Sequence, residues 1–240
     1  MDAFLLVAGY GKRLGDAAQG RPKPLVDIAG RPLLTILIEK LILLGIDHIY
    51  MNAHHLAEQI VQFREDSPHR ELITILHEEK LLGTAGTIRN FLKFREKTPL
   101  IIMHGDNFFQ DDLKTLFKAF QTRGPNLYGV VGTFISPDPE NCGIFEIDKD
   151  YIIQELHEKQ KPQFGNLANS AIYILDSNAL ELIHNLPDDL SDFSRDVLPR
   201  LLGKIVAVPL DGFFIDIGSP NNLHLAKIAA MQSQSSIVQD

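Results

Sequence analysis

Two short stretches near the N-terminus decide the fold, AGYGKRL at residues 8–14 and RPKP at residues 21–24. The first directly follows the apolar run of residues 4–8, which has the length and composition of a buried parallel strand. Ligands of open α/β sheets bind just beyond the carboxyl ends of such strands. Because Gly9 and Gly11 carry no side chains, backbone N–H groups there can approach an anion closely. The segment therefore predicts a phosphate-binding loop on an α/β sheet.

The charges of this loop favour phosphate, although its spacing matches neither of two common phosphate motifs. Arg13 suits bidentate contact with phosphate oxygens, and Lys12 and Lys23 act as point charges. A dinucleotide fingerprint would need a third glycine where Leu14 stands, and a Walker loop would need Ser or Thr in place of Arg13. The alternative interpretation is a solvated loop with incidental charge.

Apolar runs of strand length alternate with stretches of helical period over the first half of the chain. The predicted strands cover residues 4–8, 46–51, 73–76, 100–103 and 128–134, and the predicted helices cover residues 32–44, 56–64, 84–94 and 113–123. This repeated β-α-β order predicts an α/β fold with a single doubly wound, mostly parallel sheet of Rossmann-like type.

The pattern changes after residue 135. Residues 143–148 and 151–157 predict a β-hairpin, with strands at 171–175 and 205–209 and helices at 178–184 and 193–202. A last helix is predicted from Pro220, with Ser219 as its N-cap. We expect one domain over residues 1–232, with a nucleotide-binding half at about 1–134, a sugar-phosphate-binding half at 135–232 and a frayed tail at 233–240.

The composition limits the classes of partner. A formal net charge of -8 over 240 residues argues against a nucleic-acid or anionic-membrane surface. No stretch approaches the ~20 apolar residues of a membrane helix, and the N-terminal apolar run lacks the basic leader of a signal peptide. The single cysteine, Cys142, excludes an internal disulfide and fits a reducing cytoplasm.

Taken together, the motifs resemble those of the sugar-phosphate nucleotidyltransferases. The signature is Gly9-x-Gly11-x-Arg13-Leu14 followed by Pro22-Lys23-Pro24; the family commonly has Thr where Lys12 stands. Further matches follow in the family's order, namely LGTAG at 82–86, GD at 105–106, EK at 158–159, NSAIY at 169–173 and DIGSP at 216–220. The likeness is nearest to mannose 1-phosphate and D-glycero-D-manno-heptose 1-phosphate guanylyltransferases, and MurNAc 1-phosphate uridylyltransferases are also similar.

The resemblance implies a glycosyltransferase-A-type fold and an enzyme that transfers NMP from an NTP to a sugar 1-phosphate, releasing pyrophosphate. Such chemistry needs positioning and charge stabilisation more than a protein nucleophile. The implied catalytic residues are Arg13, Lys23, Asp106 and Asp216. The implied nucleotide-binding residues are Ala8, Gly9, Gly11, Lys12, Arg13, Lys23, Glu78, Gly83 and Thr84, and those for the sugar phosphate are Gly143, Glu158, Lys159 and Asn169. Family members with a C-terminal β-helix are longer, so we expect no such domain here.

Asp106 and Asp216 are the expected ligands of Mg²⁺, which favours carboxylate and phosphate oxygens. Both follow apolar, strand-like runs, so parallel strands could bring them to one edge of the sheet. Asp is also common in turns, and each aspartate taken singly could be a turn residue. Gly143 could leave room for the sugar ring or be an ordinary hairpin glycine, and Thr84 could cap a helix.

Glu78 lies five residues before Gly83, where the family often reads the base. A carboxylate matches the N1–H and N2–H₂ edge of guanine, whereas uracil offers one such donor. This favours GTP with a mannose or heptose 1-phosphate. The alternatives are a uridylyltransferase that uses UTP and an amino sugar 1-phosphate such as MurNAc 1-phosphate, and a nucleotide-binding regulatory subunit without catalysis. The oligomeric state stays open, a homodimer being one option.

Overall fold

The structure is a computed structural model that describes residues 1–159 and 164–237. Its backbone forms two compact units. The first, here the N-terminal unit, contains residues 2–81, 104–112 and those from 211 onward. The second, here the central unit, contains residues 82–103 and 113–210 together with Met1. Each unit combines strands and helices, as the sequence predicts for an α/β fold.

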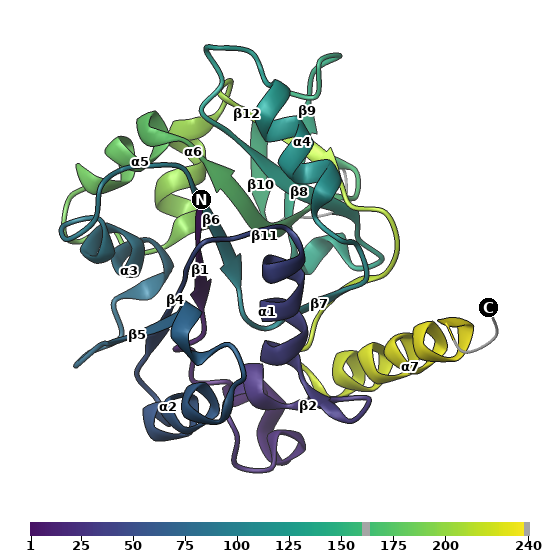
Figure 1. Cartoon of the computed structure of the whole chain (residues 1–240). Coiled ribbons are helices and arrows are strands. Elements are labelled where there is room, and N and C mark those ends of the chain that lie inside the picture. Colours follow the sequence, from purple (N-terminus) through teal and green to yellow (C-terminus); the bar gives the residue numbers. More distant parts are fainter. Residues whose placement is uncertain (160–163, 238–240) are drawn as a thin grey trace. The chain divides into compact units, whose positions relative to one another are not determined.

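Parallel strands form the framework of the N-terminal unit. β1 (Asp2–Leu6) pairs with β4 (Ile49–Ala53), and β4 pairs with β5 (Ile73–His77), all in parallel (Figure 1). The middle residues of β1 are fully buried, as expected for an apolar run within a parallel sheet. α1 (Leu33–Leu43) and α2 (Ala57–Asp66) connect these strands, so the predicted β-α-β order is confirmed here.

Short elements complete the N-terminal unit. Two 3-10 segments, η1 (Lys12–Ala18) and η2 (Lys23–Leu25), follow β1, and β2 (Asp27–Ile28) pairs with β3 (Arg31–Pro32). β7 (Asn107–Phe109) pairs antiparallel with β13 (Phe214–Asp216), and η3 spans Arg70–Leu72. These elements were absent from the sequence prediction because two- and three-residue strands carry no measurable periodicity.

The final helix, α7 (Pro220–Ile237), begins at the predicted residue. The hydroxyl oxygen of Ser219 accepts from the backbone N–H of Asn222 at 3.2 Å, which is the predicted N-cap contact. The helix continues to Ile237, whereas the sequence predicts fraying from residue 233. Residues 238–240 of that predicted tail lie outside the described part of the chain.

The central unit contains a mixed sheet. β11 (Leu167–Leu175) pairs antiparallel with β6 (Leu100–His104), β8 (Gly129–Ile135) and β9 (Gly143–Ile147), while β12 (Ile205–Pro209) runs parallel to β8. β9 and β10 (Ile153–Glu158) form the predicted hairpin. The helices are α3 (Gly83–Phe91), α4 (Lys114–Thr122), α5 (Ser177–His184) and α6 (Leu198–Leu201), with a π-helical turn at Phe193–Val197 and a 3-10 turn, η4, at Pro139–Asn141.

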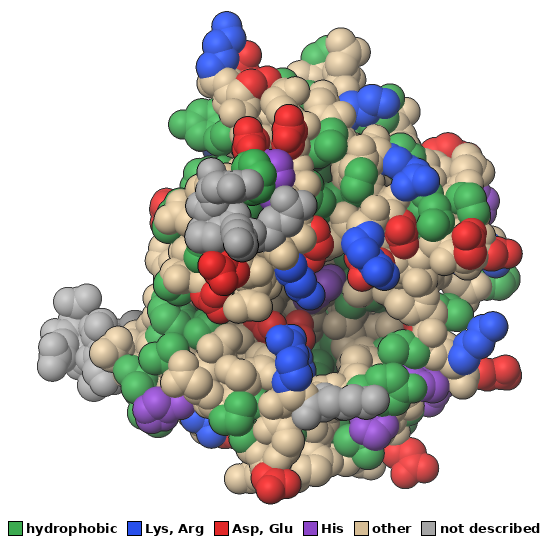
Figure 2. Space-filling view, turned by 180° about the vertical axis from the view of Figure 1, so that it is seen from behind, with side chains coloured by type: hydrophobic (Ala, Val, Ile, Leu, Met, Phe, Trp, Pro, Cys, Tyr) green, Lys and Arg blue, Asp and Glu red, His purple; other side chains and the backbone are tan. Residues whose placement is uncertain are grey.

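The surface agrees with the composition. Acidic and basic side chains are interspersed on the face seen in Figure 2, with no continuous field of Lys and Arg there. Within residues 1–159 and 164–237, no helix combines the length and apolarity needed to cross a bilayer.

β11 contains a non-glycine residue in a left-handed backbone conformation. Ala171 has a φ of 55°, in the left-handed region where a Cβ is disfavoured. The β11–β8 register shifts between Asn169 and Tyr173, and the Asn169 side-chain oxygen accepts from the Ala171 N–H at 2.9 Å. The bulge is therefore held by a local hydrogen bond against the cost of the strained residue.

We predict that Ala171→Gly stabilises the protein. Glycine adopts this φ without a Cβ penalty, so the free energy of unfolding should rise by about 0.5–1 kcal/mol, or roughly 2 °C in melting temperature. The matched control is Ala168→Gly in the same strand. Ala168 is fully buried and does not have a positive φ, so this substitution should lower the melting temperature. Thermal unfolding of the two variants checks this, and a lower melting temperature for Ala171→Gly would contradict it.

Candidate functional site

The signature loop leaves β1 and turns into η1 at Gly11. Gly11 has a φ of 63°, a left-handed conformation that favours glycine. A Cβ at Gly11 would also lie 3.1 Å from Cγ of Lys23, so space and conformation both call for glycine. Ala8 and Leu14 are buried and anchor the two ends of the loop, while Gly9 between them is exposed with open space around it. The loop is thus fixed at its ends and open to a ligand in its middle; the side chain of Lys12 lies outside the described part.

Asp106 and Asp216 come together through the β7–β13 ladder. Asp106 directly precedes β7 and Asp216 ends β13, where it is paired with Asn107. The backbone N–H of Ile217 donates to the Asp106 carbonyl at 2.9 Å. The expected reason for their proximity was wrong: an antiparallel pair of short strands joins them, rather than the edge of the parallel sheet.

Two cations lie beside this pair of carboxylates. Lys23 Nζ donates to Asp106 Oδ2 at 2.9 Å, and its side chain is only 12% exposed. Arg13 Nη2 lies 3.6 Å from Asp216 Oδ2, with 76% of its side chain exposed. The four residues named as catalytic in the sequence analysis therefore form one cluster, with Lys23 enclosed and Arg13 facing solvent.

The pKa values of the two carboxyl groups are shifted in opposite directions. Burial opposes ionisation of Asp106, but the Lys23 ammonium, aided by His104, holds its pKa below the ordinary value. Burial and the neighbouring charge of Asp106 raise the pKa of Asp216. Asp216 Oδ1 is buried and accepts no hydrogen bond from the residues that the structure describes. Asp216 Oδ1 is thus a buried acceptor to which a cation could bind.

Gly218 makes room within the cluster, and Gly105 allows the residue before Asp106 to pack closely against β1. A Cβ at Gly218 would lie 2.9 Å from Asp216 Oδ2 and 3.0 Å from Arg13 Nη2. A Cβ at Gly105 would lie 2.6 Å from Cγ1 of Val7, and the Gly105 N–H donates to the Leu6 carbonyl at 2.9 Å. Both glycines belong to the GD and DIGSP motifs, which explains why those motifs combine Asp with Gly.

Glu78 lies just beyond β5 in the same unit. Its Oε1 accepts from Asn52 Nδ2 at 2.9 Å, and the side chain is half-buried. Asn52 lies in β4, is 3% exposed, and was not among the predicted site residues. A polar residue within a buried strand was the sequence signal that could have identified it.

Gly83 and Thr84 begin α3 in the central unit. Gly83 has a φ of 76°, and a Cβ there would lie 2.5 Å from the Ser191 carbonyl oxygen. That carbonyl accepts from the Ala85 N–H at 2.8 Å, and the Thr84 hydroxyl accepts from the Phe193 N–H at 2.8 Å. The alternative of Thr84 as helix N-cap is wrong, because its hydroxyl binds the π-helical turn instead.

Glu158 and Gly143 face each other in the β9–β10 hairpin. A Cβ at Gly143 would lie 2.6 Å from Glu158 Oε2, so this glycine makes room for a carboxylate. Glu158 Oε2 is buried and, within the described residues, has no hydrogen-bond partner. Burial raises the Glu158 pKa, which Lys159 and Arg195 lower and Asp192 raises in turn. Arg195 lies in the π-helical turn and Asp192 directly precedes it; neither was predicted as a site residue.

The other two residues predicted to bind the sugar phosphate, Lys159 and Asn169, differ in how many contacts their side chains already make. Lys159 is exposed, with a φ of 50°, and its N–H donates to the Cys142 carbonyl at 3.0 Å. The Asn169 amide is occupied within β11, since Nδ2 donates to Tyr173 Oη at 2.8 Å and Oδ1 accepts from Ala171. Burial raises the Tyr173 pKa, so the phenol stays protonated.

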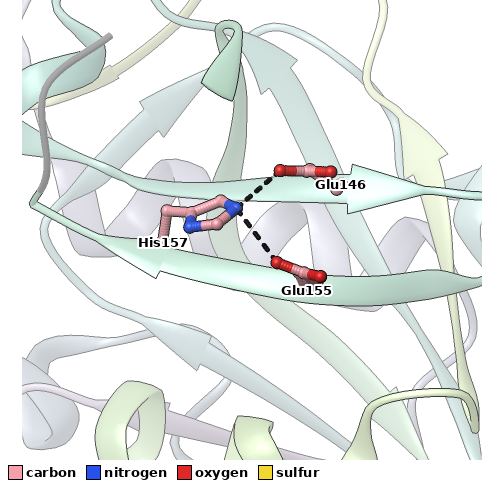
Figure 3. Close-up of side chains that lie close together, drawn as sticks. All are labelled: Glu146, Glu155 and His157. Atoms are coloured by element: carbon pink, nitrogen blue, oxygen red, sulfur yellow. Dashed lines mark hydrogen bonds and ion pairs between the residues drawn. The ribbon is translucent and has the colours of Figure 1, made fainter. Parts of the chain in front are cut away.

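A separate cluster lies on the same hairpin (Figure 3). His157 Nε2 donates to Glu146 Oε1 at 2.7 Å and lies 3.6 Å from Glu155 Oε2. Its ring stacks on Phe164, with centroids 3.6 Å apart. Both carboxylates are exposed. The cluster fixes the strand residue immediately before Glu158, which steadies the end of β10.

We predict that the two aspartates affect stability in opposite directions. Without divalent cations at neutral pH, Asp216→Asn should raise the melting temperature, because burial and Asp106 disfavour a charge there. Asp106→Asn should lower it, because Lys23 loses its charged partner in a partly buried position. Thermal unfolding checks both, with exposed Asp211→Asn as control. A shift of the same sign in both variants would overturn the charge assignment.

We also predict that both substitutions weaken divalent-cation binding. Each removes one carboxylate, so affinity for Mn²⁺, used as a probe for Mg²⁺, should fall at least about tenfold. Titration followed by electron paramagnetic resonance measures it. Unchanged affinity in Asp216→Asn would exclude this carboxylate as a ligand.

Comparison with known proteins places these features in a family. The Nucleotidyl transferase family matches residues 2–233. The bifunctional protein GlmU of Methanococcus maripaludis is 33% identical over 97% of this chain and 56% of its own length. The mannose-1-phosphate guanylyltransferase catalytic subunit beta of Xenopus tropicalis is 26% identical over 97% of this chain and 65% of its own.

Among solved structures, HddC from Yersinia pseudotuberculosis, complexed with GMP-PN, has a TM-score of 0.78 and 29% identity, covering 95% of this chain and 98% of that one. The chain spans about half the length of the GlmU relatives it matches. Since the family match covers nearly all of its residues, this chain belongs to the Nucleotidyl transferase family.

Proposed function

We propose that the protein transfers a nucleoside monophosphate from GTP to a sugar 1-phosphate of mannose or heptose type, giving an NDP-sugar and pyrophosphate. The observation that carries this proposal is the cluster of Asp106, Asp216, Lys23 and Arg13 beside the glycine loop. It combines cationic donors for phosphate with paired carboxylates for a metal ion.

The loop and its cations suit the triphosphate. Exposed Arg13 offers a planar, bidentate donor, and enclosed Lys23 provides a fixed positive charge. Backbone N–H groups around Gly9 and Gly11 can approach phosphate oxygens because no Cβ intervenes. These groups stabilise the charge that accumulates at the α-phosphate during transfer.

The carboxylate pair fits Mg²⁺. Asp216 Oδ1 is buried without a partner among the described residues, and burial, followed by the neighbouring charge of Asp106, raises the pKa of Asp216. Asp106 and Asp216 would hold the ion, with phosphate oxygens and water as its remaining ligands. When bound, Mg²⁺ neutralises phosphate charge and orients the reacting groups.

The proposed reaction is an in-line displacement at phosphorus. An oxygen of the sugar phosphate forms a bond to the α-phosphorus, and the bond to the bridging α–β oxygen breaks. Pyrophosphate leaves with the electron pair, and no proton transfer is needed because the attacking phosphate oxygen is already ionised. The protein's part is to align two polyanions and screen their repulsion.

The sugar phosphate is assigned to the central unit. Exposed Lys159 is the charge for its phosphate, and buried Glu158 Oε2 is an acceptor for a sugar hydroxyl. The Asn169 amide already makes hydrogen bonds to Tyr173 and Ala171, so a bond to a sugar hydroxyl would have to be an additional one. Gly83 and Thr84 are proposed to line the nucleoside. GTP is favoured because half-buried Glu78 matches the donors of guanine and because HddC is complexed with GMP-PN.

Pyrophosphate release with Mg²⁺, across four NTPs and a panel of sugar 1-phosphates, tests the proposal. GTP with mannose or heptose 1-phosphate should give the highest kcat/KM. UTP with an amino sugar 1-phosphate would retain the reaction class but overturn the base and sugar. If no pair of substrates releases pyrophosphate while the folded protein still binds GTP, the result would favour a nucleotide-binding regulatory protein.

We predict that Lys159→Ala raises the KM for the sugar 1-phosphate by at least about tenfold and changes the KM for GTP less than twofold. The physical reason is loss of one charge-assisted contact to the sugar's phosphate. Lys149→Ala, an exposed lysine in the hairpin turn, is the matched control. Equal effects on both KM values would remove Lys159 from this role.

A further inference from the structure

Residues 187–192 form a loop of the central unit that has neither helical nor strand backbone. The loop lies between α5 and the π-helical turn at Phe193–Val197. The backbone N–H and C=O groups of such a segment need partners outside regular secondary structure. Here the partners come from α3 and from the π-helical turn, so the loop is held from two sides.

Arg89 of α3 holds the first part of the loop. Its Nη1 donates to the Pro187 carbonyl at 2.5 Å and to the Leu190 carbonyl at 2.8 Å, and its Nη2 donates to the Asp188 carbonyl at 3.1 Å. The Asp188 carboxylate, 3.3 Å from Nη2, supplies a counter-charge. Because the guanidinium is a planar fork of donors, one side chain fixes three carbonyl oxygens in a set geometry.

The middle of the loop is bound to the turn assigned to the nucleoside. The Ser191 carbonyl accepts from the Ala85 N–H at 2.8 Å, and the Phe193 N–H donates to the Thr84 hydroxyl at 2.8 Å. A Cβ at Gly83 would lie 2.5 Å from the Ser191 carbonyl oxygen, so this glycine admits the loop at close range. We therefore expect the loop and the turn to move together.

The end of the loop lies beside the side chains assigned to the sugar phosphate. The Phe193 ring packs on the Tyr173 ring, with centroids 4.5 Å apart, and Tyr173 Oη accepts from Asn169 Nδ2. Burial raises the pKa of Glu158 most, and the neighbouring charge of Asp192 raises it further. The position of the loop thus sets both the packing and the charge around these side chains.

Asp192 is fixed by the turn that follows it. Its Oδ1 accepts from the Arg195 N–H at 2.9 Å, and its own N–H donates to Asp196 Oδ2 at 2.8 Å. Asp196 Oδ2 also accepts from the Ser191 N–H at 2.8 Å. The loop and the π-helical turn are therefore one hydrogen-bonded body, and a shift of the loop would move Asp192 with it.

We propose that Arg89 is a positioning residue for the proposed transfer: by holding residues 187–190 against α3, it fixes residues 191–195 between the turn assigned to the nucleoside and the side chains assigned to the sugar phosphate. The inference rests on the proposed function, and in particular on Glu158 and Lys159 as ligands of the sugar phosphate. Arg89 acts through the loop and is not itself a proposed ligand.

The first test is Arg89→Lys. Lysine keeps the positive charge but offers a single nitrogen, which cannot hold three carbonyl oxygens as the guanidinium fork does. We expect the KM for the sugar 1-phosphate to rise at least about tenfold, because the side chains that bind it lose a fixed neighbour. The KM for GTP should change less than about threefold, since its triphosphate is assigned to Arg13 and Lys23.

Arg123→Lys is the matched control. The Arg123 guanidinium also donates to two carbonyls and a carboxylate, those of Phe120, Leu127 and Asp176. Its side chain is 17% exposed, compared with 11% for Arg89. Both variants should lower the melting temperature, but Arg123→Lys should change the KM for the sugar 1-phosphate less than twofold. A rise of this KM in both variants would show that lost stability, rather than the loop, is the cause.

Hydrogen–deuterium exchange followed by mass spectrometry gives a readout that does not depend on the substrate. Peptides that cover residues 83–86 and 187–193 should exchange slowly in the wild type, because their amides are held by the contacts above. Arg89→Lys should raise exchange in both peptides at least about fivefold, and Arg123→Lys should leave it unchanged. Asp196→Ala, which frees the other side of the same loop, is the second variant and should raise the KM for the sugar 1-phosphate as well.

The outcomes separate the two proposals. A wild type that releases pyrophosphate with no substrate pair would overturn the proposed function, and the role of Arg89 with it, before any variant is compared. Faster exchange with an unchanged KM for the sugar 1-phosphate, in folded Arg89→Lys and Asp196→Ala, would overturn the positioning role alone. Unchanged exchange in Arg89→Lys would show that Arg89 does not hold the loop.

Discussion

The charged cluster depends on a pair of three-residue strands. The β7–β13 ladder sets Asp216 opposite Asn107 and joins Ile217 to Asp106, so two carboxylates lie together despite their separation in sequence. That proximity is unfavourable until cations approach. Lys23 and Arg13 supply this charge, and Gly218 leaves space beside Asp216 and Arg13. The signature loop is positioned in turn, because Lys23 packs against the Cβ-free side of Gly11.

Periodic elements were predictable from the sequence, and the short elements that build the site were not. α1, α5, β12 and the β9–β10 hairpin lie within a few residues of their predictions, because apolar spacing extends over enough residues to identify them. β7 and β13 are too short for any period. The nearness of Asp106 to Asp216 was expected from parallel strands that end at one edge, but the antiparallel contact that joins them could be seen only in three dimensions.

Other differences arise where a side chain satisfies a neighbour rather than a ligand. Gly143 was considered as space for a sugar ring, and it is Glu158 that occupies that space. Thr84 binds the backbone of Phe193 instead of capping α3, and Asn169 stabilises the bulge at Ala171. Sequence patterns identify polar residues near ligands, but they do not reveal which hydrogen bonds are already made. Asn52 was missed for the same reason, since its partners are 45 and 26 residues away.

Two carboxylates of the N-terminal unit are contacted by different kinds of donor. Lys23 fixes Asp106 by neutralising it, so a ligand at that position must bring enough positive charge to compete with an ammonium group. The neutral amide of Asn52 donates a hydrogen bond to Glu78. Under the proposed function, the carboxylate of Asp106 would hold a metal ion and the carboxylate of Glu78 would contact the base, so the two groups would serve different ligands.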